Sequence, residues 1–183
     1  MARSLGPVRS IWHPMRCMRR SPDRAASSMT QSSRQSCIKA PVASNPLGQI
    51  SKSAAGLRII GETLVPDEIT ALLGCQPSAS QVKGQVIQGA KTGRERTCHT
   101  GSWHLHTGDC EPENLDGQIA DLLGRMSGDL QVWKSLASKF RIDLFCGLIM
   151  ERENEGLRIS PEMLYALGER GILLCLDIYG PDC

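Results

Sequence analysis

Charge and large apolar residues divide this 183-residue chain into two unlike parts at about residue 53. Residues 1–53 contain nine basic residues against one acid, together with eleven serines, five prolines and only seven Ile, Leu, Val or Phe residues. Such a segment cannot offset its ordering entropy by burying apolar side chains. We therefore expect residues 1–53 to be a disordered, basic, Ser/Arg-rich tail. Residues 54–183, which hold 12 basic and 18 acidic residues, are expected to form a single domain.

Three explanations of this tail stay open. Its Arg-rich, Ser-rich and acid-poor composition is typical of an organellar transit peptide, although Pro14 and Pro22 argue against a long targeting helix. Alternatively, the start codon assigned to the chain lies too early, because Met29 is a possible start that opens a much less basic sequence. As a nucleic-acid arm the tail offers only Trp12 for base stacking. We expect no nucleic-acid binding except through the tail, because the acidic remainder would repel phosphate.

The sequence also indicates where in the cell the protein is expected to lie. No apolar run approaches the roughly 18 residues that a membrane-spanning helix needs, so we expect no membrane insertion. The first thirty residues lack the continuous apolar stretch of a secretory signal, and the eight cysteines include no C-x-x-C pair. These features predict a cytoplasmic protein without a disulfide framework.

Hydrophobic periodicity predicts alternating strands and helices from residue 54 onward. The expected helices cover 66–74, 115–126, 130–140 and 160–167. The expected strands cover 57–60, 102–107, 142–150, 157–159 and 172–179. This β-α-β-α-α-β-β-α-β order predicts an α+β fold, a ferredoxin-like mixed or antiparallel sheet with helices packed on one face. An exposed sheet edge at Leu57 or Trp103 would allow a dimer.

Five short motifs resemble a known family. They are, in chain order, LRIIGE at 57–62, PDEITALLG at 66–74, GSWHL at 101–105, LRISPEML at 157–164 and LDIYG at 176–180. Together they resemble the bacterial domain-of-unknown-function family 4279 over about residues 55–180. The resemblance implies a small, cytosolic, bacterial α+β domain and no activity, because the family has no established one. Trp103 belongs to the family's motif, whereas the neighbouring histidines do not.

One cluster has the residue types of a zinc site: Cys98, His104, His106 and Cys110. Zinc is bound by His nitrogen and Cys sulfur in tetrahedral sets. On a strand His104 and His106 share one face, so that their imidazoles could converge on one ion. The spacing matches no standard zinc motif, however. The alternative is that both histidines lie on the solvent face of a strand whose Trp103 and Leu105 point inward.

Other candidate positions would bind a ligand rather than a metal: Arg58, Arg94, Arg96, Trp103, Asp177 and Tyr179. Asp177 interrupts an apolar strand, where an unpaired buried carboxylate is costly. It either binds a ligand beside Tyr179, Trp103 or Arg58, or forms an ion pair with Arg58 or Arg141. Arg94 and Arg96 lie in a Gly-flanked loop that either holds an anion or is simply solvated. Asp143 is expected to be a solvated strand start.

Catalytic signatures are absent from the sequence: it contains no G-x-S-x-G, no P-loop and no H-E-x-x-H. We therefore expect a non-enzymatic module that binds a protein or a ligand, and no cofactor. Its acidic domain suits a basic protein partner, and an immunity-type role is one version of this hypothesis. The alternative is a zinc-binding protein or a small metal-dependent hydrolase that uses the His/Cys cluster.

Overall fold

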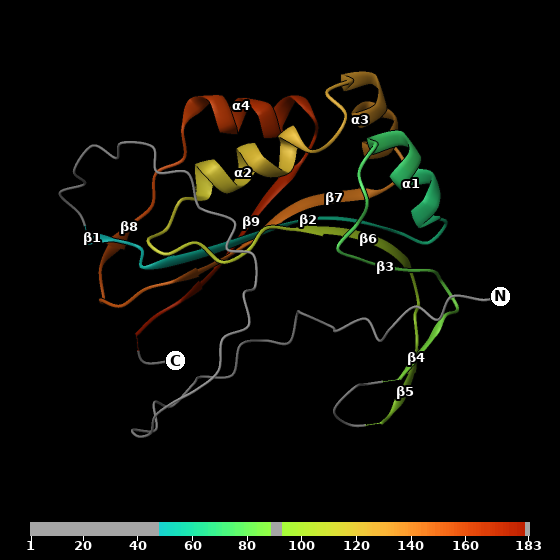
Figure 1. Ribbon diagram of the computed structural model, residues 1–183, viewed down its shortest axis with the longest axis horizontal. Coiled ribbons are helices and arrows are strands. Elements are labelled where there is room, and N and C mark those ends of the chain that lie inside the picture. The colour runs from blue at the N-terminus through green and yellow to red at the C-terminus, as the bar shows by residue number, and fades with distance from the viewer. Residues whose placement is uncertain (1–47, 89–92, 182–183) are drawn as a thin grey trace, which may run out of the picture.

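The computed structural model describes residues 48–88 and 93–181, and the predictions for residues 1–47 lie outside this range. Its centre is a five-stranded mixed sheet with the order β3-β6-β2-β7-β9 (Figure 1). The strands are β2 (Lys52–Gly61), β3 (Ala79–Gln81), β6 (Gly101–His106), β7 (Arg141–Ile149) and β9 (Leu173–Tyr179). The central strand β2 is antiparallel to both β6 and β7, whereas β7 and β9 are parallel.

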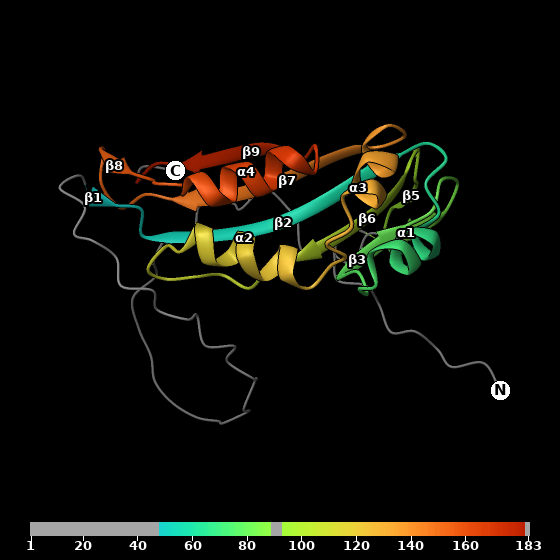
Figure 2. The same cartoon turned by 90° about the horizontal axis from the view of Figure 1, so that it is seen from above.

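The four helices of the described residues lie on one face of this sheet (Figures 1 and 2). They are α1 (Pro66–Leu73), α2 (Leu115–Gly124), α3 (Leu130–Ala137) and α4 (Pro161–Glu169). Local signals set their ends. Proline occupies the first turn of α1 and of α4, where its missing N–H costs nothing. Gly74 ends α1 with φ 69°, a left-handed conformation that suits glycine.

Two small sheets complete the fold. β1 (Gly48–Gln49) pairs in parallel with β8 (Glu155–Gly156). β4 (Val86–Gln88) and β5 (Glu95–Thr97) form an antiparallel pair that projects away from the main sheet (Figure 1). The α+β architecture, with helices on one side of a mixed sheet, is therefore confirmed.

Three details differ from the expectations. The expected domain start at residue 54 falls inside β2, which begins at Lys52. The segment 157–159 is not a strand, because Leu157 and Ile159 pack against the core without a ladder partner. The last strand, β9, follows the helix α4 as expected, and it runs parallel to β7. Leu57 and Trp103 do not lie at a sheet edge, since their strands β2 and β6 are both interior and the edges are β3 and β9.

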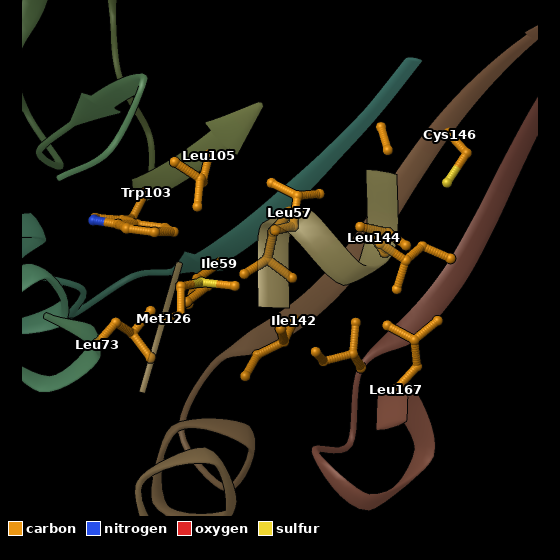
Figure 3. Packing of buried hydrophobic residues seen from close by; sticks show 14 of the residues in the cluster. Leu57, Ile59, Leu73, Trp103, Leu105, Met126, Ile142, Leu144, Cys146 and Leu167 are labelled. Atoms are coloured by element: carbon orange, nitrogen blue, oxygen red, sulfur yellow. The ribbon is translucent and has the colours of Figure 1, made fainter. Parts of the chain in front are cut away.

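The hydrophobic core lies between the sheet and the helices (Figure 3). Side chains that alternate along β2, β6 and β7 supply it: Leu57, Ile59, Trp103, Leu105, Ile142 and Leu144. Trp103 is fully buried, and its Nε1 donates a hydrogen bond to Thr70 Oγ1 at 3.1 Å. Among the described residues, no helix has the length and apolar character needed to cross a membrane.

Candidate functional site

The opposite face of the sheet carries charged, imidazole and aromatic side chains. Because side chains alternate along a strand, the residues between the core positions of β2, β6 and β7 point to this second face. In the strand register, Arg58 lies between His104 on β6 and Asp143 on β7. Gly56 likewise lies between His106 and Phe145. We call this surface, defined by Arg58, His104, His106, Asp143 and Phe145, the open face, because no helix of the described chain covers it (Figure 1).

Asp143 is the buried charge at the centre of the open face. Its side chain is 0% exposed. Arg58 Nε donates to Asp143 Oδ1 at 2.5 Å, and Arg141 Nη2 lies 2.8 Å from Asp143 Oδ2. A carboxylate removed from water needs such compensation, because its desolvation penalty is large. Two arginines around one aspartate leave the group with a net charge of +1.

The guanidinium of Arg58 is held from two directions. Asp143 fixes its Nε edge, and the ring of Phe145 lies under its plane with 4.4 Å from the guanidinium carbon to the ring centroid. The side chain of Arg58 is 24% exposed. Its two terminal nitrogens donate no hydrogen bond to any residue that the structure describes. The two-point support therefore leaves the outer edge of a rigid cation accessible from the open face.

The two histidines are adjacent and electrically neutral at pH 7. Their ring centroids are 5.8 Å apart and the rings lie edge to face. The pKa of His106 is lowered to about 4, by burial first and then by the nearby His104 and Arg58. The pKa of His104 is also lowered, by burial first and by Arg58 second, against an opposing effect of Asp143. Each neutral imidazole offers one N–H donor and one acceptor nitrogen.

His104 also has an unsatisfied polar atom. Its Nε2 is buried and has no hydrogen-bond partner within the described ranges. Buried polar atoms are nearly always satisfied, because an unpaired one costs free energy that water would otherwise supply. This nitrogen belongs to the residue directly opposite Arg58 in the strand register, so a ligand atom that reached it would be stabilised.

The predicted zinc set is not assembled. His104 and His106 do share a face, as expected, but the described residues contain no group of three or more His, Cys, Asp or Glu side chains placed to hold a metal ion. Cys98 is buried beside the β4–β5 pair, where its Sγ donates to Gln81 Oε1 at 3.3 Å. Cys110 is buried, forms an isolated antiparallel β-bridge with Ser53 through its backbone, and is disulfide-bonded through its sulfur. The sequence predicts no disulfide framework, but Cys110 takes part in a disulfide, so its thiolate is not available to a metal.

The predicted ligand-binding residues fall into separate places. Trp103 lies in the core on the helix face, so it is not beside Arg58. Arg94 and Arg96 are exposed at the β4–β5 pair, and Arg96 Nη2 donates to Gln81 Oε1 at 3.3 Å. Of these four residues, only Arg58 lies on the open face.

Asp177 and Tyr179 lie on β9, on the same side of the sheet as Arg58. Asp177 is opposite Gly147 in the register of β7 and β9. The hydroxyl of Tyr179 donates to Asp177 Oδ2 at 2.6 Å. Asp177 is therefore paired with its own strand neighbour, whereas Arg58 and Arg141 both pair with Asp143.

Asp143 is the residue that the sequence analysis missed, since it is buried and not a solvated strand start. The alternation of Arg141, Asp143 and Phe145 with the apolar residues of β7 was a usable signal for their common face. The burial of Asp143 depends on its register with Arg58, 85 positions earlier in the chain. A single strand pattern does not contain that register.

Comparison with known proteins identifies one family. The family model described as "Domain of unknown function (DUF4279)" matches residues 51–181, a range that includes all five strands of the main sheet and all four helices. No curated protein and no solved structure matches the chain. The matched family description names no activity, so the chemistry must be argued from the side chains themselves.

Proposed function

Because the chain belongs to the DUF4279 family, whose description assigns no activity, we propose a function from the open face itself: a non-enzymatic module that binds an oxyanion. The ligand group is a carboxylate or a phosphate, and the open face of β2, β6 and β7 is its binding surface. This proposal narrows the broader expectation of a protein- or ligand-binding module to one chemical class of ligand.

The observation that carries the proposal is the held guanidinium of Arg58. An arginine fork presents parallel N–H donors that match the two oxygens of a carboxylate or phosphate. In this protein the fork is oriented before any ligand arrives, because Asp143 holds one edge and Phe145 supports the plane. A preorganised side chain loses less conformational entropy on binding than a mobile surface arginine does.

His104 would complete the site as a neutral donor. Its lowered pKa favours the uncharged imidazole at pH 7, which can donate one N–H to an oxyanion. The unpartnered Nε2 of His104 supports a polar ligand atom at this position. Because the chain from residue 54 onward is acidic, long-range attraction does not favour an anion. The affinity would therefore come from these local contacts.

Oxyanion binding can be tested on the full chain by NMR titration, with inorganic phosphate and acetate as separate probes. We expect saturable shifts of the His104 and His106 side-chain resonances for at least one probe. Arg58→Gln should weaken that binding more than tenfold. Arg125→Gln is the matched control, because Arg125 lies at the end of α2, is 40% exposed and pairs with Asp121, away from the open face. Circular dichroism of each variant checks that the fold persists.

Arg58→Lys separates fork geometry from charge. A lysine keeps the positive charge but loses the planar pair of donors. We expect it to bind the oxyanion nearly as poorly as Arg58→Gln does. Equal affinity of the parent and the folded Arg58→Gln variant would exclude the site, and so would shifts that never saturate with either probe.

A further inference from the structure

The strand β9 is an exposed edge of the main sheet (Figure 2). It is seven residues long, and three of its apolar side chains are largely exposed: Leu173 at 57%, Leu176 at 43% and Ile178 at 54%. β9 contains no lysine and no proline, and Tyr179 already hydrogen-bonds its one charged residue, Asp177. Long apolar edge strands favour pairing with another strand, and natural monomers normally protect them.

The other edge of the sheet is protected in the usual ways. β3 has only three residues, Ala79–Gln81, and two of them are polar. A strand of three residues offers little ladder to a further strand, whereas β9 is seven residues long and carries exposed apolar side chains. Of the two edges, β9 is therefore the one suited to pairing with another strand.

We propose that β9 pairs antiparallel with β9 of a second copy of this chain, around a two-fold axis at Leu176. In this register Leu176 faces its own copy and Leu174 faces Ile178. On the other side of the sheet Cys175 faces Asp177, and Leu173 faces Tyr179. A two-fold contact must be self-complementary, and here apolar residues oppose apolar ones while no two like charges face each other.

The packing around β9 supports a second copy of the strand as its partner. Leu174, Leu176 and Ile178 lie beside Leu144, Cys146 and Leu148 of β7, which belong to the buried core. The helix layer covers the β7 residues but leaves Leu176 and Ile178 exposed. Pairing two copies would continue the same apolar layer across the axis and would join two five-stranded sheets into one.

A single strand pair forms a small interface. Contacts of this kind lie near the lower end of specific interfaces, at about 1,200 Å² or less of total buried surface. We therefore expect a reversible dimer with a dissociation constant in the micromolar range. The dimer does not depend on the oxyanion site, since Arg58 lies on an interior strand and Leu176 belongs to the helix face.

Sedimentation velocity of the full chain over a range of concentrations tests the dimer. Leu176→Lys would place two ammonium groups opposite each other on the axis, and it should weaken association at least tenfold. Leu72→Lys is the matched control, because Leu72 is similarly exposed, at 48%, but lies on α1. It should leave the dissociation constant unchanged. A parent chain that stays monomeric at every concentration, or a dimer that tolerates Leu176→Lys, would overturn the proposal.

Cysteine cross-linking tests the register. Opposed residues of antiparallel strands have Cα atoms about 4.5–5.5 Å apart, within the range that a disulfide spans. Leu176→Cys should therefore give a covalent dimer under mild oxidation, above the background of the parent chain. Ile178→Cys should not, because residue 178 faces residue 174 of the other copy. Equal cross-linking of both variants would contradict the register, and a monomer whose edge binds only unrelated extended peptides would contradict self-pairing.

Discussion

The two faces of the main sheet use the same strands for different purposes. On the helix face, Trp103 and Ile59 are fully buried among apolar neighbours. On the open face, Arg58, His104 and Asp143 form a polar group in which one buried charge is compensated and one cation remains accessible. Since strand alternation separates the two sets completely, substitutions on the helix face should change stability. Substitutions on the open face should change stability at some positions and ligand binding at others.

Trp103→Ala should give the largest effect, a loss of roughly 3–5 kcal/mol of unfolding free energy, because it empties a fully buried site. Urea denaturation of the full chain measures this loss. Thr70→Val is the control, since it removes only the hydrogen bond from Trp103 Nε1 and should cost about 1 kcal/mol. If the Trp103 variant loses no more than the Thr70 variant does, Trp103 is not a core residue.

Asp143→Ala should be the most destabilising change on the open face. Removing one partner of a buried ion pair leaves the other charge uncompensated, at about 3–5 kcal/mol when both are buried. We expect roughly 2–3 kcal/mol here, because Arg58 and Arg141 both keep contact with water. Asp109→Ala is the matched control. Asp109 is 52% exposed and pairs with Lys52, so its loss should cost well under about 1 kcal/mol.

The helix face could be predicted from the sequence and the open face only in part. Alternation along 102–107 and 142–150 predicts which residues are apolar and inward, and the structure confirms Leu105, Ile142 and Leu144 in the core. Proline and capping signals likewise predict where α1 and α4 begin. These features depend on neighbours within a few residues, and such neighbours are visible in one sequence.

The open face depends on strand register, which one sequence does not contain. Arg58 was predicted as a ligand-binding residue, but its pairing with Asp143 follows from the contact of β2 with β7. The short strands β3 and β5 were missed because they are polar and only three residues long. Cys98 and Cys110 are close to the histidines in the sequence, yet the fold places them in different surroundings.

The lowered pKa of His106 predicts a stability difference between neutral and acidic pH. The pKa is about 4 in the folded protein and about 6.5 in the unfolded chain, so the unfolded state binds more protons between these pH values. Stability should therefore fall as the pH decreases from about 6.5 to about 4. We expect a contribution on the order of 1–2 kcal/mol, since His106 is only partly buried.

His106→Gln isolates this contribution from the carboxylates that titrate in the same range. The stability of the parent chain at pH 4.5, relative to pH 7.5, should fall further than that of the variant. His104, whose pKa is lowered in the same direction, remains in both proteins. Parallel pH profiles of the parent and the variant would show that His106 is protonated equally easily in both states.

Arg141→Ala should have the smallest effect and distinguishes the two arginines that hold Asp143. Arg141 is 63% exposed, so water screens its ion pair, whereas Arg58 is 24% exposed and is also supported by Phe145. We expect a loss of about 1 kcal/mol or less, which should shrink further in high salt. Oxyanion affinity should remain within about threefold of the parent, because the fork of Arg58 stays in place. A loss equal to that of Asp143→Ala would make Arg141 a full partner of the buried charge. A tenfold loss of affinity without a loss of stability would instead extend the binding site to Arg141.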